Sequence, residues 1–438
     1  MAQETVRLAD YAAALRFEDL PAEVVECAKA GIADTVAAAI CGSVLPWSRI
    51  VAGYAERTGP GGKSRIFGGP AVQPPAAALA NGALAHAFEL DSLTRPGAGV
   101  HPGAALLPAA LAVAQQEGAG GRALIAAFVA GCEAMVRIGR ATGHTNEARG
   151  FHAPGTTGPF GAAVAAGHII GLAMPAMAHA LGIAGSLAGG LLEFARAGDG
   201  GMVKRLHLGR ACEGGVLAAS LARDGFAGPS TVLEGEFGFL RVFCTEWDVA
   251  ELTRGLGEEF ATLTLCLKRY PCHINAHAPV RAVWDLRREH GFEPAAVTAI
   301  TVRASERAVA RHNIPEPPDL MLAQYSMPFC TALALYRDPH NPESFDEAAL
   351  RDPAILALSR RVRLEPTSAG HGSWGSTVAI ELADGRRLHR QIEDATLAPS
   401  DLPDKFERLT RGVLGPGWEP LFARLQRLEQ EDRLDWLG

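Results

Sequence analysis

The residues best suited to acid–base chemistry lie close together in residues 81–108, NGALAHAFELDSLTRPGAGVHPGAALLP. This stretch contains His86, Glu89, Asp91 and His101, so two imidazoles and two carboxylates occur within sixteen positions. A helix of small residues is expected to lead into a Gly/Pro-rich loop, which delivers His101 to the start of a second apolar helix. Polar side chains at such a break favour function over core packing, and we interpret the stretch as the floor of an active site.

A second Gly/Pro-rich loop, residues 150–161 (GFHAPGTTGPFG), carries His152, Thr156 and Thr157 ahead of another expected helix. A helix N-terminus presents free backbone N–H groups and a partial positive charge, so this loop is suited to holding a carboxylate or a phosphate. Further candidates are cations and phenols: Lys204, Arg205, His207 and Arg210 in MVKRLHLGRAC just before a helix, Lys268, Arg269 and Tyr270 at the end of an expected strand, and Tyr325 in QYSMPF.

Two familiar motifs are only partly present, and two others are absent. Residues 59–64 (GPGGKS) resemble the end of a phosphate-binding loop, but Arg57 stands where the first glycine is required, so a surface turn is expected. His273 and His277 are spaced for one helical face, but no third zinc ligand is spaced with them. No GxSxG sequence occurs, and no glycine-rich turn follows a strand as a dinucleotide site requires. The sequence therefore favours neither a metal centre, nor a nucleotide site, nor a serine hydrolase of this type.

Composition limits the class of protein. The chain has 438 residues, 48% hydrophobic and 20% charged, which suffices for a large core, and two domains are expected. A net charge of -7 argues against a nucleic-acid partner, because such binders concentrate basic residues. The polar N-terminal stretch and the lack of a long uncharged apolar run predict neither a secretory signal nor a membrane span. Eight cysteines without a CxxC pair are typical of a reduced, cytoplasmic protein.

The first part of the chain predicts a succession of helices rich in Ala and Gly. In residues 21–41, apolar side chains recur at helical spacing between Pro21, which suits a first turn, and Gly42, which suits a stop. Small residues let helices approach closely, so a compact all-helical bundle is expected. Further helices are predicted at 46–57, 73–88, 103–117, 121–142, 157–171, 175–188 and 211–224.

The pattern changes near residue 262. Residues 262–270 (TLTLCLKRY) alternate apolar and more polar residues as a strand does, and residues 296–304 are rich in Val, Ile and Thr. Further on, Asp384-Gly385 lies between two alternating runs, which predicts a hairpin. These signals indicate an α+β region.

Amphipathic helices return from Asp401 and are expected to dock on the first helices. We therefore predict a mainly α protein with two domains. Residues 1–261 and 396–438 are expected to form a large all-helical domain, and residues 262–395 an inserted α+β lid domain.

Several blocks resemble, in order, sequences of the MmgE/PrpD family. They are NGALAHAFELDS, VHPGAALLPAALA, GFHAPGTTGPFGAAVAAG, MVKRLHLGRAC and LKRYPCHINAHAP, and they extend over nearly the whole chain. The family includes 2-methylcitrate dehydratase, cis-aconitate decarboxylase and iminodisuccinate epimerase. The resemblance implies a helical domain built from both ends of the chain, an inserted α+β lid domain, a homodimer, and no metal or organic cofactor.

The resemblance also implies a pocket. Where many members carry a run of acids followed by threonine, this chain has Glu89, Asp91 and Thr94 in ELDSLT, so either acid can occupy the usual site. The loop before His152 is closer to that of the decarboxylase and epimerase branch than to that of methylcitrate dehydratase. The residues that the resemblance marks are Asp91, His101, His152, Lys204, Lys268 and Tyr325.

The chemistry that these members share is proton movement at a carbon beside a carboxylate. Such a step builds negative charge on the carboxylate oxygens, so the site needs preorganised cations and an acid/base group. We expect Lys204 and Lys268 to supply the charge and His101 to carry the proton, since a histidine pKa can lie near neutrality. Asp91 is expected to orient a histidine or protonate a leaving group, and His152 to bind a carboxylate or act as partner acid. The predicted catalytic set is His101, His152, Asp91, Lys268 and Tyr325, and the predicted substrate-binding set is Lys204, Thr94, Thr156, Arg269 and Glu89.

The predicted function is a cofactor-independent lyase, a dehydratase first and a decarboxylase second, acting on a small di- or tricarboxylic acid. An epimerase of a dicarboxylate is the alternative, and it would need two acid/base groups, such as His101 and Tyr325, on opposite faces of one carbon. A non-catalytic carboxylate-binding homologue is a third reading, because the acidic run at residues 89–94 departs from the family pattern. The expected partners are the anionic substrate and a second copy of the chain, with no nucleic acid and no membrane.

Overall fold

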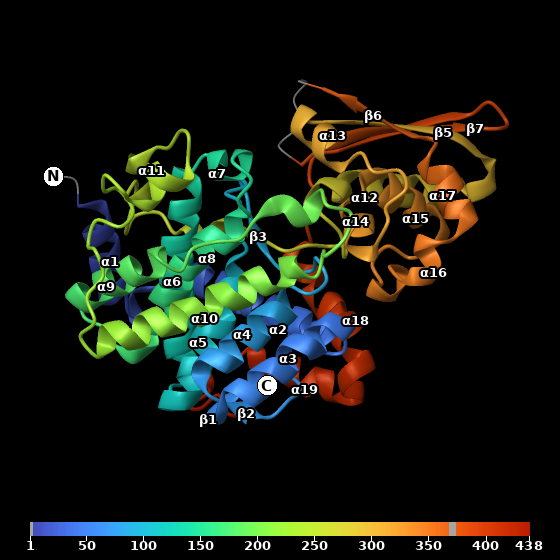
Figure 1. The fold of residues 1–438 in the computed structure, drawn as a ribbon. Coiled ribbons are helices and arrows are strands. Elements are labelled where there is room, and N and C mark those ends of the chain that lie inside the picture. Colours follow the sequence, from blue (N-terminus) through green and yellow to red (C-terminus); the bar gives the residue numbers. More distant parts are fainter. Residues whose placement is uncertain (1–2, 368–373) are drawn as a thin grey trace.

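The computed structural model describes residues 3–367 and 374–438. It is mainly helical, with a small mixed sheet in the C-terminal region, as the sequence predicted. Figure 1 shows a large helical body, coloured blue to green with red helices at its lower edge, beside a smaller α+β unit in orange. The helices of the body are α1 (Glu4–Ala14), α2 (Ala22–Ser43), α3 (Pro46–Thr58), α4 (Pro74–Ala85), α5 (Pro102–Glu117), α6 (Gly121–Ala141), α7 (Thr145–Ala148), α8 (Ala153–Ile170), α9 (Met174–Gly185), α10 (Val203–Arg223), α11 (Phe239–Phe243), α18 (Leu402–Leu414) and α19 (Trp418–Leu425).

The centre of the helical body consists of α4, α5, α6, α8 and α10, which pack on one another. Helices α5 and α8 are buried almost along their full length, which explains why they are apolar on every side. A Cβ atom at Gly215 of α10 would lie 2.3 Å from the Cβ of Ala162 of α8, so glycine is required at this crossing. The Ala- and Gly-rich sequence thus gives helices that approach closely around the site.

The helical body is not entirely helical, contrary to the sequence prediction. Residues 59–64, predicted as a turn, enter strand β1 (Pro60–Arg65), which pairs with β2 (Ala71–Val72). A Cβ atom at Gly62 would lie 2.0 Å from the carbonyl oxygen of Val72, so this glycine permits close pairing and is not a turn signal.

The strand predicted at residues 262–270 is wrong for most of its length. A 3-10 turn at Ala261–Thr264 comes first, and only β4 (Leu265–Cys266) is a strand, paired with β3 (Leu93–Thr94). Both the backbone N–H and the hydroxyl of Thr262 donate to the carboxylate of buried Glu133, which favours the turn over an extended chain. The alternation of apolar and polar residues in 262–270 reflects a segment that is half-buried beside the helical body and is a strand only at β4.

The α+β unit carries the largest sheet, with strand order β6-β5-β7-β8. The hairpin predicted at Asp384-Gly385 is confirmed: β7 and β8 pair antiparallel, and Gly385 has a φ of 87°. Helices lie on one face of this sheet (Figure 1). The elements are α12 (Ile274–His290), α13 (Glu306–His312), α14 (Leu320–Tyr325), α15 (Met327–Tyr336), α16 (Glu347–Leu350), α17 (Pro353–Ser359), β5 (Val297–Ala304), β6 (Val362–Pro366), β7 (Ser376–Leu382) and β8 (Arg387–Ile392).

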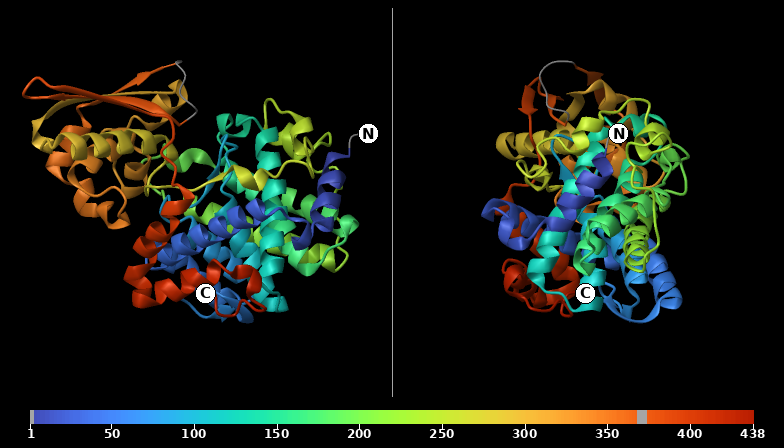
Figure 2. Two further views of the ribbon diagram at one scale, coloured as in Figure 1. Left: turned by 180° about the vertical axis from the view of Figure 1, so that it is seen from behind. Right: turned by 90° about the vertical axis from the view of Figure 1, so that its left-hand side faces the viewer.

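The C-terminal helices return to the helical body. Figure 2 shows α18 and α19, in red, against the first helices of the chain and apart from the orange sheet. Lys405 of α18 donates to the Asp34 carboxylate of α2 at 2.5 Å and to the Leu90 carbonyl at 2.9 Å. All three groups are buried, so α18 supports the segment that carries Asp91.

Replacing Lys405 with alanine is expected to lower the free energy of unfolding by about 3–5 kcal/mol, because Asp34 would be left buried without its counter-ion. The matched control is Arg411→Ala on the same helix, which removes a partly exposed pair with Glu407 and a contact with the Trp418 ring and should change that free energy by at most about 1 kcal/mol. Urea titration of both variants measures the difference. Equal losses in the two variants would contradict the assignment of Lys405 as the anchor.

No single helix among the described residues is long and apolar enough to cross a membrane. Helices α2 and α3 meet the length and composition criteria only as a pair, and they are bent by 95° at the break between them.

Candidate active site

A cavity of about 780 Å³ lies where the helical body meets the α+β unit, and we call it the central cavity. Its lining is rich in cations and imidazoles drawn from distant parts of the chain. Of the residues predicted from sequence, it includes Glu89, Thr94, His101, His152, Lys204, Lys268 and Tyr325.

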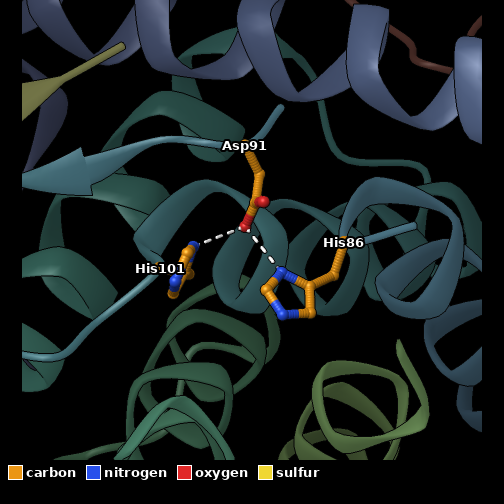
Figure 3. A group of neighbouring side chains, drawn as sticks. All are labelled: His86, Asp91 and His101. Atoms are coloured by element: carbon orange, nitrogen blue, oxygen red, sulfur yellow. Dashed lines mark hydrogen bonds and ion pairs between the residues drawn. The ribbon is translucent and has the colours of Figure 1, made fainter. Parts of the chain in front are cut away.

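Asp91 holds two histidines at the floor of the cavity. Its Oδ2 atom lies 2.7 Å from Nδ1 of His101 and 2.9 Å from Nδ1 of His86, and the three side chains converge in Figure 3. His86 ends α4 and His101 precedes α5, so the loop between these two helices brings the residues together. Burial alone would raise the pKa of Asp91, but His86 and His101 lower it well below its ordinary value. Asp91 is therefore a carboxylate that orients His101.

His101 is the member of this triad that faces the cavity. Its Nδ1 atom is held by Asp91, so its Nε2 atom is the nitrogen available to a substrate. His86 is fully buried, and burial lowers its pKa well below the ordinary value, so it stays neutral at neutral pH. One ligand atom from each of the three residues lies within 4.8 Å of the others, so the set also offers donors that a divalent metal ion uses.

Glu89 binds the two predicted lysines. Its Oε2 atom lies 2.7 Å from Nζ of Lys268, while its Oε1 atom contacts Nζ of Lys204 and lies 3.3 Å from Nη1 of Arg205. Glu89 has a φ of 57°, and this left-handed backbone turns its side chain toward the lysines while Asp91 points to the histidines. The two acids thus serve different groups, and Glu89 is the one that lines the cavity.

The two buried lysines and Arg205 make a positively charged environment that favours the binding of an anion. Burial, Arg205 and Lys268 lower the pKa of Lys204 well below its ordinary value, and burial also lowers the pKa of Lys268. Asp91 opposes the lowering of the Lys268 pKa, and Glu89 contacts the Nζ atoms of both lysines. Lys204 also lies 5.2 Å from the centre of the Tyr325 ring, which places Tyr325 beside the cations. A carboxylate entering the cavity would meet these preorganised charges.

His152 lines another wall of the cavity. Its Nδ1 atom lies 2.9 Å from Nδ1 of His207, and its ring packs against the edge of Phe194. Burial and the neighbouring His207 lower the pKa of His152 well below its ordinary value. Lys204 and His207 lie within the first turns of α10, which starts at Val203 and not near residue 211 as predicted.

Three predicted residues do not line the cavity: Asp91, which is buried and acts through His101, and Arg269 and Thr156. Arg269 turns away and donates to Asp401 at 2.9 Å, and it is absent from the lining. Thr156 is buried beneath His152, where its hydroxyl donates to the Ala153 carbonyl and accepts from Asn146. Thr94 does line the cavity, and its buried hydroxyl has no hydrogen-bond partner among the described residues.

Other polar residues around the cavity were not predicted from sequence. Buried Gln324 accepts from Arg205 at 3.2 Å and donates to the Phe88 carbonyl, fixing the guanidinium that contacts Glu89. Arg307 and Arg311 line the cavity from α13, and both pair with Glu147 of α7. The available signals were the position of Gln324 beside Tyr325 and the four-residue spacing of the arginines on a helix.

His273 and His277 do not form a metal site together. His273 lines the cavity and caps α12 by accepting from the Asn275 N–H at 3.4 Å, whereas Nε2 of buried His277 lies 3.2 Å from the Cys272 carbonyl. Within the described ranges, the one cluster of three side chains that could ligate a metal ion is that of His86, Asp91 and His101.

Comparisons with known proteins identify the family. The MmgE/PrpD N-terminal domain matches residues 6–252, and the MmgE/PrpD C-terminal domain matches residues 270–423. A cis-aconitate decarboxylase from Aspergillus terreus is 34% identical over 429 residues, covering 92% of this chain and 87% of the relative. The cis-aconitate decarboxylase-like protein oryM from Aspergillus oryzae is 28% identical, covering 97% and 93%. The human cis-aconitate decarboxylase is 27% identical, covering 96% and 90%. The chain belongs to the MmgE/PrpD family.

Proposed function

We propose that this protein is a lyase that decarboxylates cis-aconitate or a closely similar tricarboxylate. The observation that carries the proposal is the cavity in which an Asp91-oriented histidine faces two buried lysines. The decarboxylase names of the relatives support this substrate class. They do not single out the hydro-lyase that the sequence analysis placed first.

The charges of the site suit a substrate with several carboxylates. Lys204, Lys268 and Arg205 surround the single carboxylate of Glu89, so a net positive charge remains for an incoming anion. These groups are buried, and charge interactions between buried groups are stronger than in solvent. Each lysine can therefore hold a substrate carboxylate while keeping its contact with Glu89.

The proposed reaction breaks one C–C bond and forms one C–H bond. Loss of CO2 from the CH2–COO− group of cis-aconitate moves the electron pair toward the neighbouring double bond, and negative charge builds on the carboxylate at its far end. A proton must then be added to the carbon beside that carboxylate. Nε2 of His101 is placed to donate it, because Asp91 holds Nδ1 and leaves Nε2 available to the cavity. The lysines stabilise the developing charge, and solvent restores the proton to His101 after product release.

Incubation with cis-aconitate, citrate, 2-methylcitrate, malate and aspartate-derived dicarboxylates, followed by proton NMR and CO2 detection, tests this proposal. The expected result is CO2 release with a new vinyl signal from cis-aconitate alone. Water loss from citrate or 2-methylcitrate without CO2 would indicate a hydro-lyase, and racemisation of a dicarboxylate would indicate an epimerase. Tight binding of a carboxylate without turnover would indicate a non-catalytic carboxylate-binding protein. The homodimer, the cytoplasmic location and the independence from metal remain predictions, and repeating the assay with a chelator tests the last of these.

A further inference from the structure

The imidazole of His207 lies behind His152, on the side away from the central cavity. His207 belongs to the second turn of α10, and its Nδ1 atom lies 2.9 Å from Nδ1 of His152. His207 does not line the central cavity but lines a second pocket of about 490 Å³, next to exposed Arg210. The contact therefore joins a residue of the proposed active site to a residue outside it.

The two rings are held in place from several sides. Phe194 packs edge-on against both, with ring centres 5.3 Å from His152 and 5.8 Å from His207. Gly190 has a φ of 117°, its carbonyl accepts from the His152 N–H at 3.0 Å, and a Cβ there would lie 3.1 Å from Nδ1 of His207. Any side chain at Gly190 would press on the contact between the histidines, so the loop is shaped to preserve it.

A contact between two Nδ1 atoms carries a single hydrogen, so two arrangements exist. Either His207 donates and His152 carries its own hydrogen on Nε2, or His152 donates and its Nε2 atom has a lone pair. Burial, His207, His101 and Arg205 keep the pKa of His152 far below its ordinary value, against the opposing charge of Asp91. Burial and Lys204 lower the pKa of His207 to about 4. Both rings are thus neutral at neutral pH, and the choice of tautomer decides what His152 presents to the cavity.

The anionic substrate decides between the two arrangements. The Nε2 atom of His152 is the nitrogen left for the cavity, where a lone pair would repel a carboxylate and an N–H group would bind it. We propose that His207 donates to His152 and thereby fixes His152 as a neutral Nε2–H donor to the substrate carboxylate on which charge builds. The unprotonated Nε2 atom of His207 then faces the second pocket.

This inference rests on the proposed function, in which charge develops on a carboxylate oxygen during decarboxylation. A neutral imidazole N–H can stabilise such charge without giving up its proton, and the same principle is known from other enzymes. His207 acts only through His152, so it is a positioning residue. Its removal should lower kcat more than it raises KM, because the hydrogen bond strengthens as charge builds.

Two nearly isosteric variants separate donation from mere packing. His207→Gln keeps an N–H group that can donate to His152, whereas His207→Glu offers only acceptor oxygens when ionised. We expect His207→Glu and the apolar His207→Met to lower kcat for cis-aconitate by about 10- to 100-fold, with KM changed by less than about 3-fold. His207→Gln should lose several-fold less than His207→Glu. Equal rates in the Gln and Glu variants would overturn the proposal.

Two further measurements exclude a purely structural effect. In a His152→Ala background the difference between the Gln and Glu variants should vanish, and its persistence would show that His207 acts through another group. 15N NMR of the wild-type protein with tricarballylate, a saturated tricarboxylate, should show the His152 hydrogen on Nε2; a hydrogen on Nδ1 would refute the proposal. The NMR result does not depend on turnover, so a wild-type protein that releases no CO2 would refute the proposed function alone.

Discussion

Replacing His101 with glutamine is expected to lower kcat for cis-aconitate decarboxylation by about 10²- to 10⁴-fold, the usual contribution of a positioned general acid. Glutamine is close in size and can still hydrogen-bond to Asp91, but it cannot deliver a proton from the position of Nε2. The lysines and Glu89 are untouched by this change, so tricarboxylate affinity should remain within a few-fold. Steady-state kinetics and calorimetric binding of tricarballylate measure the two quantities separately.

The matched control for this prediction is His179→Gln. His179 lies on α9, is partly buried and is absent from the cavity lining, and its Nδ1 atom lies 2.8 Å from the backbone carbonyl of Gly228. Its substitution should leave kcat unchanged. A His101→Gln protein that unfolds at a much lower temperature than the His179→Gln protein would show that His101 is structural, and one that retains its rate would remove His101 from the mechanism.

Replacing Lys268 with methionine is expected to lower kcat by about 10²- to 10³-fold, as removal of one preorganised charge donor does in other enzymes. Methionine keeps most of the buried volume of the lysine stem. The change removes the 2.7 Å contact with Glu89 and one of the two ammonium groups offered to the substrate, so KM should rise as well. An unchanged rate would show that Lys268, and the segment after β4 that carries it, do not belong to the active site.

The decrease in kcat caused by the missing ammonium group of Lys268 has to be separated from any effect of losing one cationic partner of Glu89. Adding Glu89→Gln to Lys268→Met removes the carboxylate that has lost one of its three cationic partners, and this double variant should not recover kcat, because the ammonium group offered to the substrate is still missing. Lys29→Met is the matched control, because Lys29 is a buried lysine that pairs with Glu26 and Glu429 away from the cavity. Its rate should equal that of the wild type.

Local patterns predict the elements that carry the site. Helical spacing and small residues anticipate α4, α5 and α8, and Asp384-Gly385 anticipates the β7–β8 hairpin. These signals are local, and the structure follows them because the central helices are packed tightly by Ala and Gly. The alternation at residues 262–270 fails because Thr262 finds a buried partner 129 positions away, in Glu133, which no local pattern reveals.

Side-chain direction was the harder part of the candidate site to predict. Lys268 and Arg269 are neighbours just after β4, where the chain bends, and only Lys268 reaches the cavity while Arg269 pairs with Asp401. The different tasks of Glu89 and Asp91 depend on the positive φ of Glu89, which spacing does not specify. The partnership of His152 with His207 depends on how α10 crosses α8.

The most direct test of the account is one turnover experiment with cis-aconitate in D2O, in which CO2 is measured and the product is examined by NMR. We expect one equivalent of CO2 for each product molecule and one deuterium on the carbon beside the carboxylate where charge built up. The same experiment with His101→Gln should give neither product nor label at comparable enzyme concentration. A hydroxylated product, or deuterated cis-aconitate without CO2, would contradict the assignment of this protein as a decarboxylase.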